Sequence, residues 1–526
     1  MLFNSYAFIF LFLPVVFIGM FWIGRYSNQL AALWLALASL TFYAVWDPRF
    51  VILLLASIAF NYSMGFSIGQ QKVKGNDKHA KYILTTAIII NLLLLAYFKY
   101  ANFFLDSANH LFDSRFPALN IILPLGISFF TFTQITFLVD VYKGIVREYN
   151  FVHYLLFVTY FPHLIAGPVL HHKQMIPQFV KPETYQINWS NVAVGVSIFV
   201  LGLGKKVLLA DNFAEYASPI FNLLNNGAAP MLIEAWVGIL SYTLQLYFDF
   251  SGYSDMAVGL SLMLNVHLPI NFDSPYKATS IIEFWRRWHM TLSAFLRDYL
   301  YIPLGGNRKG VFRRYVNLLV TMLLGGLWHG AGWTYVIWGG LHGFYLIVNH
   351  FWREVKQKFA INDSGPITQL FAGALTFLAV MIAWVFFRAG SFSAASTMLS
   401  GMAGVNGISL PLGLKDHLPS DLLMFHLEFN GIMPLIEITG EKALFDITLG
   451  LIIVWFFPNV RQMLVAYKPT WEDIANKPTP ATLPKNFLAR KLSWQPGALQ
   501  AWLIGTVFVL CIFSLTKVSE FLYFQF

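Results

Sequence analysis

The sequence predicts an all-α polytopic membrane protein, and two observations carry this prediction. Of 526 residues, 57% are hydrophobic and 12% are charged, whereas soluble domains carry about 25% charged residues. The 51 Phe and 16 Trp residues suit a chain with a lipid-facing surface and two aromatic interfaces. No soluble domain of useful size remains between the apolar runs. We therefore expect one integral membrane domain over residues 1–526.

The apolar runs give the expected helices in order, because a membrane-spanning helix needs about 20 mostly apolar residues. They are 7–24, 29–46, 50–69, 83–100, 121–142, 151–166, 192–210, 231–249, 252–269, 312–328, 332–350, 367–387, 444–457 and 500–516. Since some of these runs are tilted or re-entrant, we expect about 11 to 14 membrane helices. The first run lacks a basic start and a small-residue cleavage site, which indicates a retained helix with a kink at Pro14.

The basic residues gather in short loops, and this sets the expected topology. The segments 71–82, 307–314, 353–358 and 458–498 are rich in Lys and Arg, and such loops remain cytoplasmic. Counting helices outward places both termini and the segment 389–443 on the far side of the membrane, and this segment is expected to be an external loop. The net charge of +9 thus reports topology and gives no support for nucleic-acid binding.

Two segments do not have the pattern of plain spanning helices. Segment 163–179 is interrupted by glycine and proline, and non-helical backbone at membrane depth must be buried in protein or line a cavity. Segment 280–306 has apolar residues at helical spacing with Trp and Arg, which predicts one amphipathic interfacial helix. Glu283 and Arg287 are four residues apart in it and are expected to pair.

Histidines within the apolar runs are the first candidates for a functional site, because ionisable residues are costly in lipid. His329, beside Trp328, is flanked by glycines, which let backbone or a ligand approach closely. His342 lies in "GGLHG", a pattern that equally suits close helix packing. His289 lies in the amphipathic segment, where it has either a catalytic role or a structural one.

Two carboxylates and a basic cluster complete the candidate substrate-binding residues. Asp249 and Asp255 lie in "QLYFDFSGYSDMAVG", where the alternative is a structural role at a helix break around Ser251 and Gly252. Arg286 and Arg287, with the basic residues of 307–314, are placed to hold the phosphates of a coenzyme A donor. The alternative is that this cluster is a topology signal alone.

The chemistry available to such a site needs neither a metal nor a bound cofactor. One cysteine, Cys511, cannot build a disulfide or a thiolate metal site. The chain has no H-E-x-x-H, phosphate-binding P-loop or dinucleotide-binding glycine motif. A neutral buried imidazole can take a proton from a hydroxyl as general base. Acyl transfer to a hydroxyl fits this, with a second histidine or a Trp donor stabilising the oxyanion.

Several long motifs, in order, resemble the membrane-bound O-acyltransferases. They are "YFDFSGYSDMAVGL", "EFWRRWHMTLSAFLRDYLYIPLGGNR" and "TMLLGGLWHGAGWTYVIWGGLHG", supported by "ILPLGISFFTFTQITFLVDVYKG", "FPHLIAGPVL", "KYANFFLDS" and "FLYFQF". The chain is most similar to the bacterial branch that acetylates exopolysaccharides, of the alginate O-acetyltransferase (AlgI) type. The core motifs lie within about 95–350, and the resemblance is weakest in 389–443 and 460–498.

The resemblance implies a helical bundle around a central reaction chamber that opens to the cytoplasm. It implies that His329 is the catalytic histidine of the "LWHG" motif and that His289 is a second important one. Acetyl-CoA or another acetyl thioester would be the donor, periplasmic SGNH-type acetyltransferases the partners, and an exported polysaccharide, with alginate first, the final acceptor. The implied location is the bacterial inner membrane, with both termini on the periplasmic side.

Three alternatives remain open at this point. Acetylation of another exopolysaccharide, such as cellulose, is one, because the shared motifs do not encode the sugar. D-Alanyl transfer to teichoic acid is a second, within the same family. The third is a polysaccharide transporter without chemistry, since buried histidines and broken helices serve transporters too.

Overall fold

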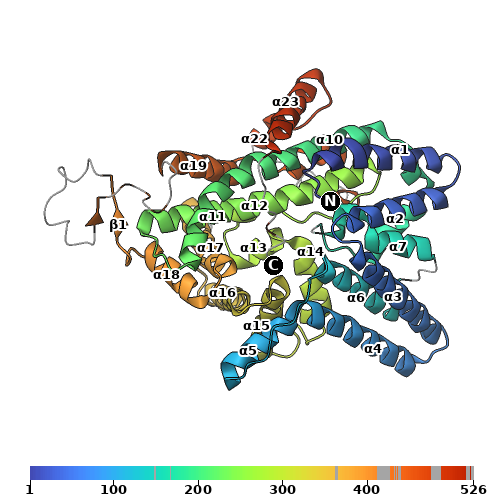
Figure 1. Cartoon of the computed structure of the whole chain (residues 1–526), viewed down its shortest axis with the longest axis horizontal. Coiled ribbons are helices and arrows are strands. Elements are labelled where there is room, and N and C mark those ends of the chain that lie inside the picture. The colour runs from blue at the N-terminus through green and yellow to red at the C-terminus, as the bar shows by residue number, and fades with distance from the viewer. Residues whose placement is uncertain are drawn as a thin grey trace. The chain divides into compact units, whose positions relative to one another are not determined.

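The computed structural model describes residues 1–146, 150–165, 167–361, 365–411, 427–429, 431, 433, 435, 440–475, 487–516 and 522. Helices dominate these residues (Figure 1). Strands within the described ranges are limited to two short parallel ones, β1 (Ile408–Ser409) and β2 (Leu427–Glu428). The predicted all-α class is therefore confirmed.

The described residues form two compact units, and the helical segments Trp189–Asn225 and Leu232–Met263 each pass from one unit into the other. The first unit is Met1–Leu203, Tyr253–Asn271 and Val460–Thr516. The second is Gly204–Gly252, Phe272–Asn459 and the end of the chain. The expectation of a single membrane domain stays a prediction.

The first unit contains the N-terminal helices and the C-terminal helix. Its elements are η1 (Phe8–Phe12), α1 (Leu13–Gly24), α2 (Asn28–Ala44), α3 (Arg49–Val73), α4 (Asp77–Leu95), η2 (Ala96–Tyr100), α5 (Ala101–Phe112), α6 (Ile127–Tyr142), α7 (Phe151–Thr159), α8 (Phe161–Leu164), α9 (His172–Val180), η3 (Pro182–Tyr185), α10 (Trp189–Gly204), α20 (Val460–Leu464), η9 (Val465–Tyr467), α21 (Trp471–Ala475), α22 (Phe487–Lys491) and α23 (Ala498–Ser514). Asn61 of α3 and Asn91 of α4 exchange amide hydrogen bonds of 3.1 and 2.7 Å. Such buried polar pairs hold helices together in lipid, where the apolar surface gives little driving force.

The second unit contains all the histidines predicted to be functional. Its elements are η4 (Lys205–Ala210), α11 (Asp211–Asn225), most of α12 (Leu232–Met263), η5 (Pro275–Lys277), α13 (Ile281–Arg287), α14 (Met290–Phe295), η6 (Leu296–Tyr301), α15 (Val311–His329), α16 (Trp333–Lys358), α17 (Pro366–Arg388), α18 (Phe392–Met402), β1, β2 and α19 (Gly440–Phe456). Its core is rich in aromatic side chains from α12, α13, α16 and α17. These rings surround the site described below.

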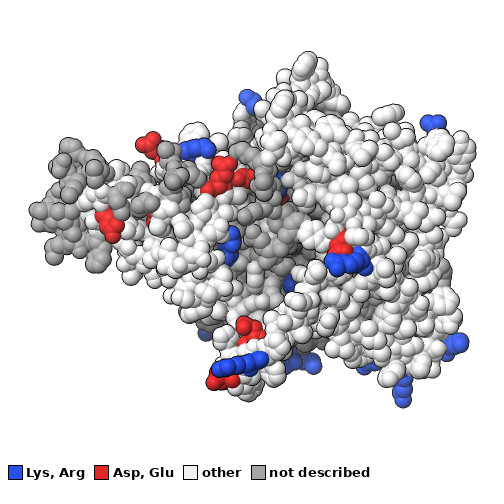
Figure 2. All heavy atoms as spheres, in the orientation of Figure 1, with Lys and Arg blue, Asp and Glu red and all other residues white. Residues whose placement is uncertain are grey.

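By length and composition, four helices of the described residues are apolar enough to cross a membrane: Arg49–Val73, Asp77–Phe112, Trp189–Asn225 and Pro366–Arg388. A fifth is present if the bent pair of α19 with α20 and η9 is one span, and three shorter apolar helices accompany them. The expected total of about 11 to 14 stays a prediction. Charged side chains are sparse over much of the face drawn in Figure 2, as a surface in contact with lipid requires.

Four predictions about the elements are wrong in detail. The runs 231–249 and 252–269 form one continuous helix over 232–263, because Ser251 and Gly252 are buried within it and the segment has no proline. Segment 280–306 is instead divided into α13, α14 and η6, with the break at Trp288 and His289.

The other two differences concern loops and short runs. The run 151–166 forms the short helices α7 and α8, which Tyr160 separates with a non-helical backbone. The segment predicted as external loop, 389–443, begins with α18, which Ser391 caps by accepting a hydrogen bond from the Ala394 amide. Residues 412–426 of that segment, like 476–486 of the basic loop, lie outside the described residues.

Candidate active site: a buried histidine cluster

Helices α15 and α16 approach each other closely through paired glycines. A Cβ atom on Gly326 would lie 2.2 Å from the carbonyl oxygen of Tyr335, and one on Gly339 would lie 2.2 Å from that of Met322. Neither position has room for a side chain. The close packing expected from "GGLHG" is therefore present, and it fixes His329 and His342, the histidines of the two helices, relative to each other.

Two of the glycines near His329, Gly326 and Gly330, make room for protein atoms, which is the first of the two alternatives that the sequence left open. A Cβ atom on Gly330 would lie 2.1 Å from the ring of Tyr335. The backbone of α16 occupies the space beside Gly326 in the same way. Neither of these two glycines therefore leaves space for a substrate.

His329 ends α15 and is 8% exposed. Aromatic rings surround its imidazole, with centroid distances of 4.9 Å to Trp328, 5.0 Å to Trp338 and 5.3 Å to Phe387. The imidazole of His289 lies 6.3 Å away. The two histidines that the resemblance singled out thus lie side by side, although 40 residues separate them in the sequence.

His289 is fully buried and has an unusual backbone conformation. It lies between α13 and α14 with φ 43° and ψ 53°, in the left-handed region. That region costs a non-glycine residue free energy, and such residues are concentrated at functional sites. The rings of Phe250 and His289 pack perpendicular to each other, with centroids 4.7 Å apart and planes at 89°. The break turns the side chain of His289 towards Trp328 and His329.

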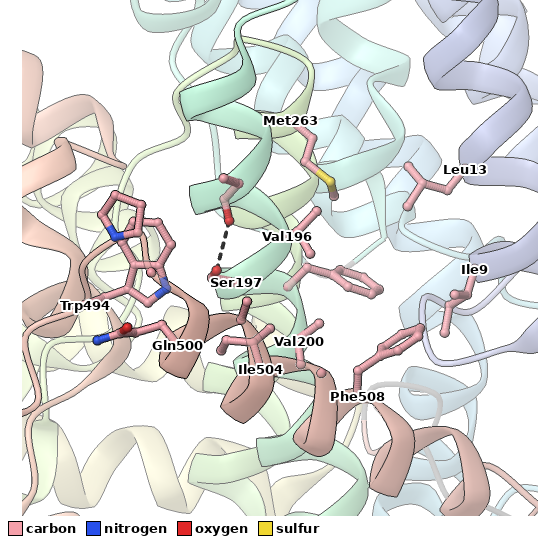
Figure 3. A pocket seen from close by; sticks show the side chains of 16 residues that line it. Ile9, Leu13, Val196, Ser197, Val200, Met263, Trp494, Gln500, Ile504 and Phe508 are labelled. Atoms are coloured by element: carbon pink, nitrogen blue, oxygen red, sulfur yellow. Dashed lines mark hydrogen bonds between the residues drawn. The ribbon is translucent and has the colours of Figure 1, made fainter.

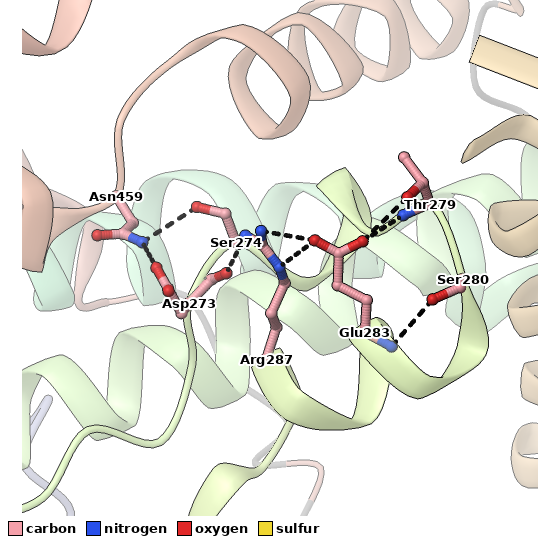
Figure 4. Close-up of polar contacts among 7 residues, drawn as sticks. All are labelled: Asp273, Ser274, Thr279, Ser280, Glu283, Arg287 and Asn459. Carbon is pink, nitrogen blue, oxygen red and sulfur yellow. Dashed lines mark hydrogen bonds and ion pairs between the residues drawn. The ribbon is translucent and has the colours of Figure 1, made fainter. Parts of the chain in front are cut away.

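A polar network holds α13, the helix that leads into His289. Figure 4 shows its seven residues, Asp273, Ser274, Thr279, Ser280, Glu283, Arg287 and Asn459. The ion pair predicted between Glu283 and Arg287 is confirmed, because Arg287 Nη2 lies 2.7 Å from Glu283 Oε1. Arg287 also donates to the carbonyl oxygen of Asp273, whose carboxylate accepts from Asn459. The network ties α13 to the chain on either side of it.

Hydrogen bonds in this network set the charge state of Glu283. Burial raises the pKa of its carboxyl group, but hydrogen bonds from Thr279 and the guanidinium of Arg287 outweigh burial. The pKa of Glu283 is therefore below its ordinary value, and the residue is a carboxylate at neutral pH. Arg287 is engaged with protein groups, whereas Arg286 is exposed.

His342 of α16 is separated from His329 by the ring of one tryptophan. It is fully buried, and its Nδ1 accepts a hydrogen bond of 3.3 Å from the indole of Trp285. The ring of Trp338 lies between the two histidines, 5.0 Å from His329 and 4.9 Å from His342. His342 therefore supports the wall of the site through Trp338.

Asp249 forms a buried ion pair with Lys206, a residue that was not among the predicted site residues. Its Oδ1 lies 2.5 Å from Lys206 Nζ, and Lys206 also contacts Asp211 at 2.8 Å. Lys206 lies in the π-helical turn η4, and such turns are frequent at functional sites. A signal was present in the sequence, since Lys205 and Lys206 interrupt the apolar run 192–210.

The candidate substrate-binding residues thus divide between the units. Asp249 adjoins Phe250, the residue that contacts His289. Asp255 belongs to the first unit, whereas all three histidines belong to the second. The described residues contain no group of three or more His, Cys, Asp or Glu side chains arranged to hold a metal ion. What the second unit offers chemically is two neighbouring imidazoles in an aromatic enclosure, suited to moving a proton in a water-poor site.

These features define a multi-pass membrane protein with a buried pair of histidines. A family model for the membrane-bound O-acyltransferases matches residues 77–390, which is more than half of the chain and contains all three histidines. The chain belongs to the membrane-bound O-acyltransferase family and is an acyltransferase.

Curated relatives cover most of the chain. It is 43% identical to the peptidoglycan O-acetyltransferase of Helicobacter pylori over 87% of this chain and 89% of that protein. It is 44% identical to the probable alginate O-acetylase AlgI of Pseudomonas aeruginosa over 76% of this chain and 75% of the other. A more distant relative, at 25% identity over 67% of this chain and 84% of the other, is the teichoic acid D-alanyltransferase of Streptococcus thermophilus.

Proposed function

We propose that this protein is an O-acetyltransferase that passes acetyl groups from a cytoplasmic thioester across the inner membrane, for O-acetylation of an exported glycan. The observation that carries the proposal is the pair His329 and His289, whose ring centroids lie 6.3 Å apart inside an aromatic enclosure. At this separation one oxygen atom can hydrogen-bond to a nitrogen of each ring. The relatives named O-acetyltransferase and O-acetylase support the choice of acetyl as the group transferred.

The chemistry assigned to each residue balances without a metal or a redox partner. His329 takes the proton of the acceptor hydroxyl while that oxygen attacks the thioester carbonyl. The new C–O bond forms, the C–S bond breaks, and the proton passes to the leaving thiolate. His289, or the indole N–H of Trp328, stabilises the oxyanion formed on the way. Trp338 and Phe387 keep water away from the thioester, which limits hydrolysis.

Topology and charge support the proposed donor and the proposed compartment. Arg286 is exposed and, with the basic loop 307–314, offers phosphate-binding groups for acetyl-CoA on the side proposed to be cytoplasmic. Both chain termini are proposed to be periplasmic. Support for a common side comes from Tyr6, whose hydroxyl donates a 2.8 Å hydrogen bond to the carbonyl oxygen of Ile512, near the end of α23. A periplasmic SGNH-type partner would complete delivery to the polymer.

Two acceptors are proposed, and different observations favour them. Alginate is favoured by the motifs of the sequence and by relatives of that name at 42–45% identity. Peptidoglycan is favoured by the length of the alignment. The relative named for peptidoglycan aligns over 483 residues of sequence, compared with 409 for the alginate relatives.

The decisive experiment measures acetyl groups on both polymers. Cells lacking the gene are complemented with the wild type, His329→Gln or His350→Gln, and acetyl content of exopolysaccharide and peptidoglycan is determined by NMR. We expect loss of acetyl from one polymer in the deletion strain. His329→Gln should fail to restore it, since a general base contributes roughly 10²–10⁴-fold. His350 lies on α16 outside the cluster, so His350→Gln should restore acetylation at equal membrane levels.

Other outcomes would replace the proposal. Wild-type acetylation with His329→Gln would remove His329 from the chemistry. Loss of the polymer itself would indicate transport. Loss of D-alanine from a teichoic acid, with acetyl unchanged, would indicate the activity named for the more distant relatives.

A further inference from the structure

An apolar pocket lies within the first unit, formed by α1, α10, the end of α12 and α23. Its volume is about 590 Å³, which is within the range of about 300–1,000 Å³ for small-molecule sites. Figure 3 shows side chains from α10 and α23 facing each other across it, with Met263 at one edge. Because α1, α10 and α23 are apolar helices of a membrane protein, the medium around them is hydrocarbon.

The two ends of the pocket differ in polarity. Phe508, Ile9 and Leu13 form one end, where the lining is entirely hydrocarbon and aromatic (Figure 3). Trp494 and Gln500 form the other end. From Gln500 to Phe508 the helix rises about 12 Å, at about 1.5 Å per residue. The pocket therefore suits an elongated apolar chain that carries a polar group at one end.

Trp494 provides a second observation that indicates a ligand. Its side chain is 9% exposed, and its indole Nε1 has no hydrogen-bond partner among the residues that the structure describes. A buried donor without a partner is costly. An ester oxygen at this end of the pocket would accept from it.

Basic residues near the Trp494 end of the pocket indicate that the lipid headgroup is anionic. Arg490 and Lys491 of α22 are exposed and precede Trp494 by four and three residues. Three to four residues of chain span at most about 14 Å. Both cations therefore lie within reach of a phosphate held beside Trp494, where an anionic lipid surface attracts basic residues.

We propose that this pocket binds one acyl chain of an anionic phospholipid, with the ester beside Trp494 and the phosphate near Arg490 and Lys491. The site is separate from the acyl-transfer chemistry, because all the residues that line it belong to the first unit, whereas the three histidines belong to the second. The bound lipid would lie between the N-terminal apolar helix α1 and the C-terminal apolar helix α23. The proposal does not rest on the proposed function.

Gly505 on α23 allows the pocket to be filled from within. A Cβ atom there would meet no atom within 4 Å, so Gly505→Leu places its side chain in open space. Gly373 on α17 is a matched control, because a Cβ atom there also meets nothing and Gly373 does not line the pocket. The full-length proteins are purified in detergent, mixed with phosphatidylglycerol or with phosphatidylcholine of identical chains, and examined by native mass spectrometry.

We expect one retained phosphatidylglycerol per wild-type chain and per Gly373→Leu chain. Gly505→Leu should lower the retained fraction about tenfold, since its side chain takes the space of the acyl chain. Arg490→Gln combined with Lys491→Gln should abolish the preference for phosphatidylglycerol over phosphatidylcholine. Equal retention by the two leucine variants would overturn the pocket as the site. An unchanged lipid preference in the double variant would overturn the anionic headgroup.

Discussion

Adding a single methyl group to Gly339 should separate α15 from α16 and disable the histidine cluster. The new Cβ would lie 2.2 Å from the carbonyl oxygen of Met322 and 3.0 Å from its carbonyl carbon. Ordinary carbon–oxygen contacts are about 3.3 Å or longer, so the helices must move apart by roughly 1 Å. Overpacking of this kind costs roughly 1–3 kcal/mol of stability. His329 moves with α15, and a displacement of about 1 Å at a reacting group lowers the rate about 100-fold.

Gly340→Ala is the matched control, because its Cβ would meet the side chain of Leu323 at 3.5 Å, an ordinary contact. Acetyl content of the polymer is measured in cells complemented with each variant at equal membrane levels, and melting temperature is measured in detergent. Gly339→Ala should lower both, whereas Gly340→Ala should resemble the wild type. If Gly339→Ala kept wild-type acetyl content and melting temperature, close glycine packing would not be what positions His329.

Two further predictions concern charged groups of the second unit. Lys206→Met should prevent stable accumulation in the membrane, because an unpaired buried charge costs roughly 3–5 kcal/mol. Lys206→Met combined with Asp249→Leu should recover accumulation, measured as folded protein after detergent extraction. Full accumulation of Lys206→Met alone would contradict the cost assigned to the unpaired charge. Glu283→Gln should lower the melting temperature at pH 7, because it removes the carboxylate that Thr279 and Arg287 stabilise. Since the folded-state pKa of Glu283 is lowered, its stabilisation is present above the unfolded pKa of about 4.3 and is lost as pH falls through the folded pKa. The difference between variant and wild type should therefore shrink in acid, and a difference independent of pH would exclude the charge as its cause.

The spans predicted best from the sequence are those that composition alone determines. The run 367–387 became α17, Pro366–Arg388, because its residues are apolar throughout and Pro366 suits a helix start. The pair Glu283 and Arg287 followed from local spacing. Both depend only on residues close together in the chain, which is the range that periodicity can report.

The details of the site depend on contacts distant in sequence, and periodicity does not report them. Helical spacing continues on both sides of His289, so nothing local marks the break there. Lys206 and Asp249 are 43 residues apart, and their pairing depends on how α12 packs against η4. The glycines beside His329 read equally as room for a ligand or for a helix, and only the position of Tyr335 decides.

The left-handed backbone of His289 affects how substitutions there must be interpreted. An alanine at this position would remove the imidazole and, in the same step, place a residue that disfavours positive φ at the junction of two helices. Loss of activity in such a variant would mix a chemical effect with a conformational one. Asparagine tolerates this backbone and keeps a polar side chain, so His289→Asn removes the imidazole alone. Glycine at the same position would be the opposite probe, since it relieves the conformation and removes every side-chain contact.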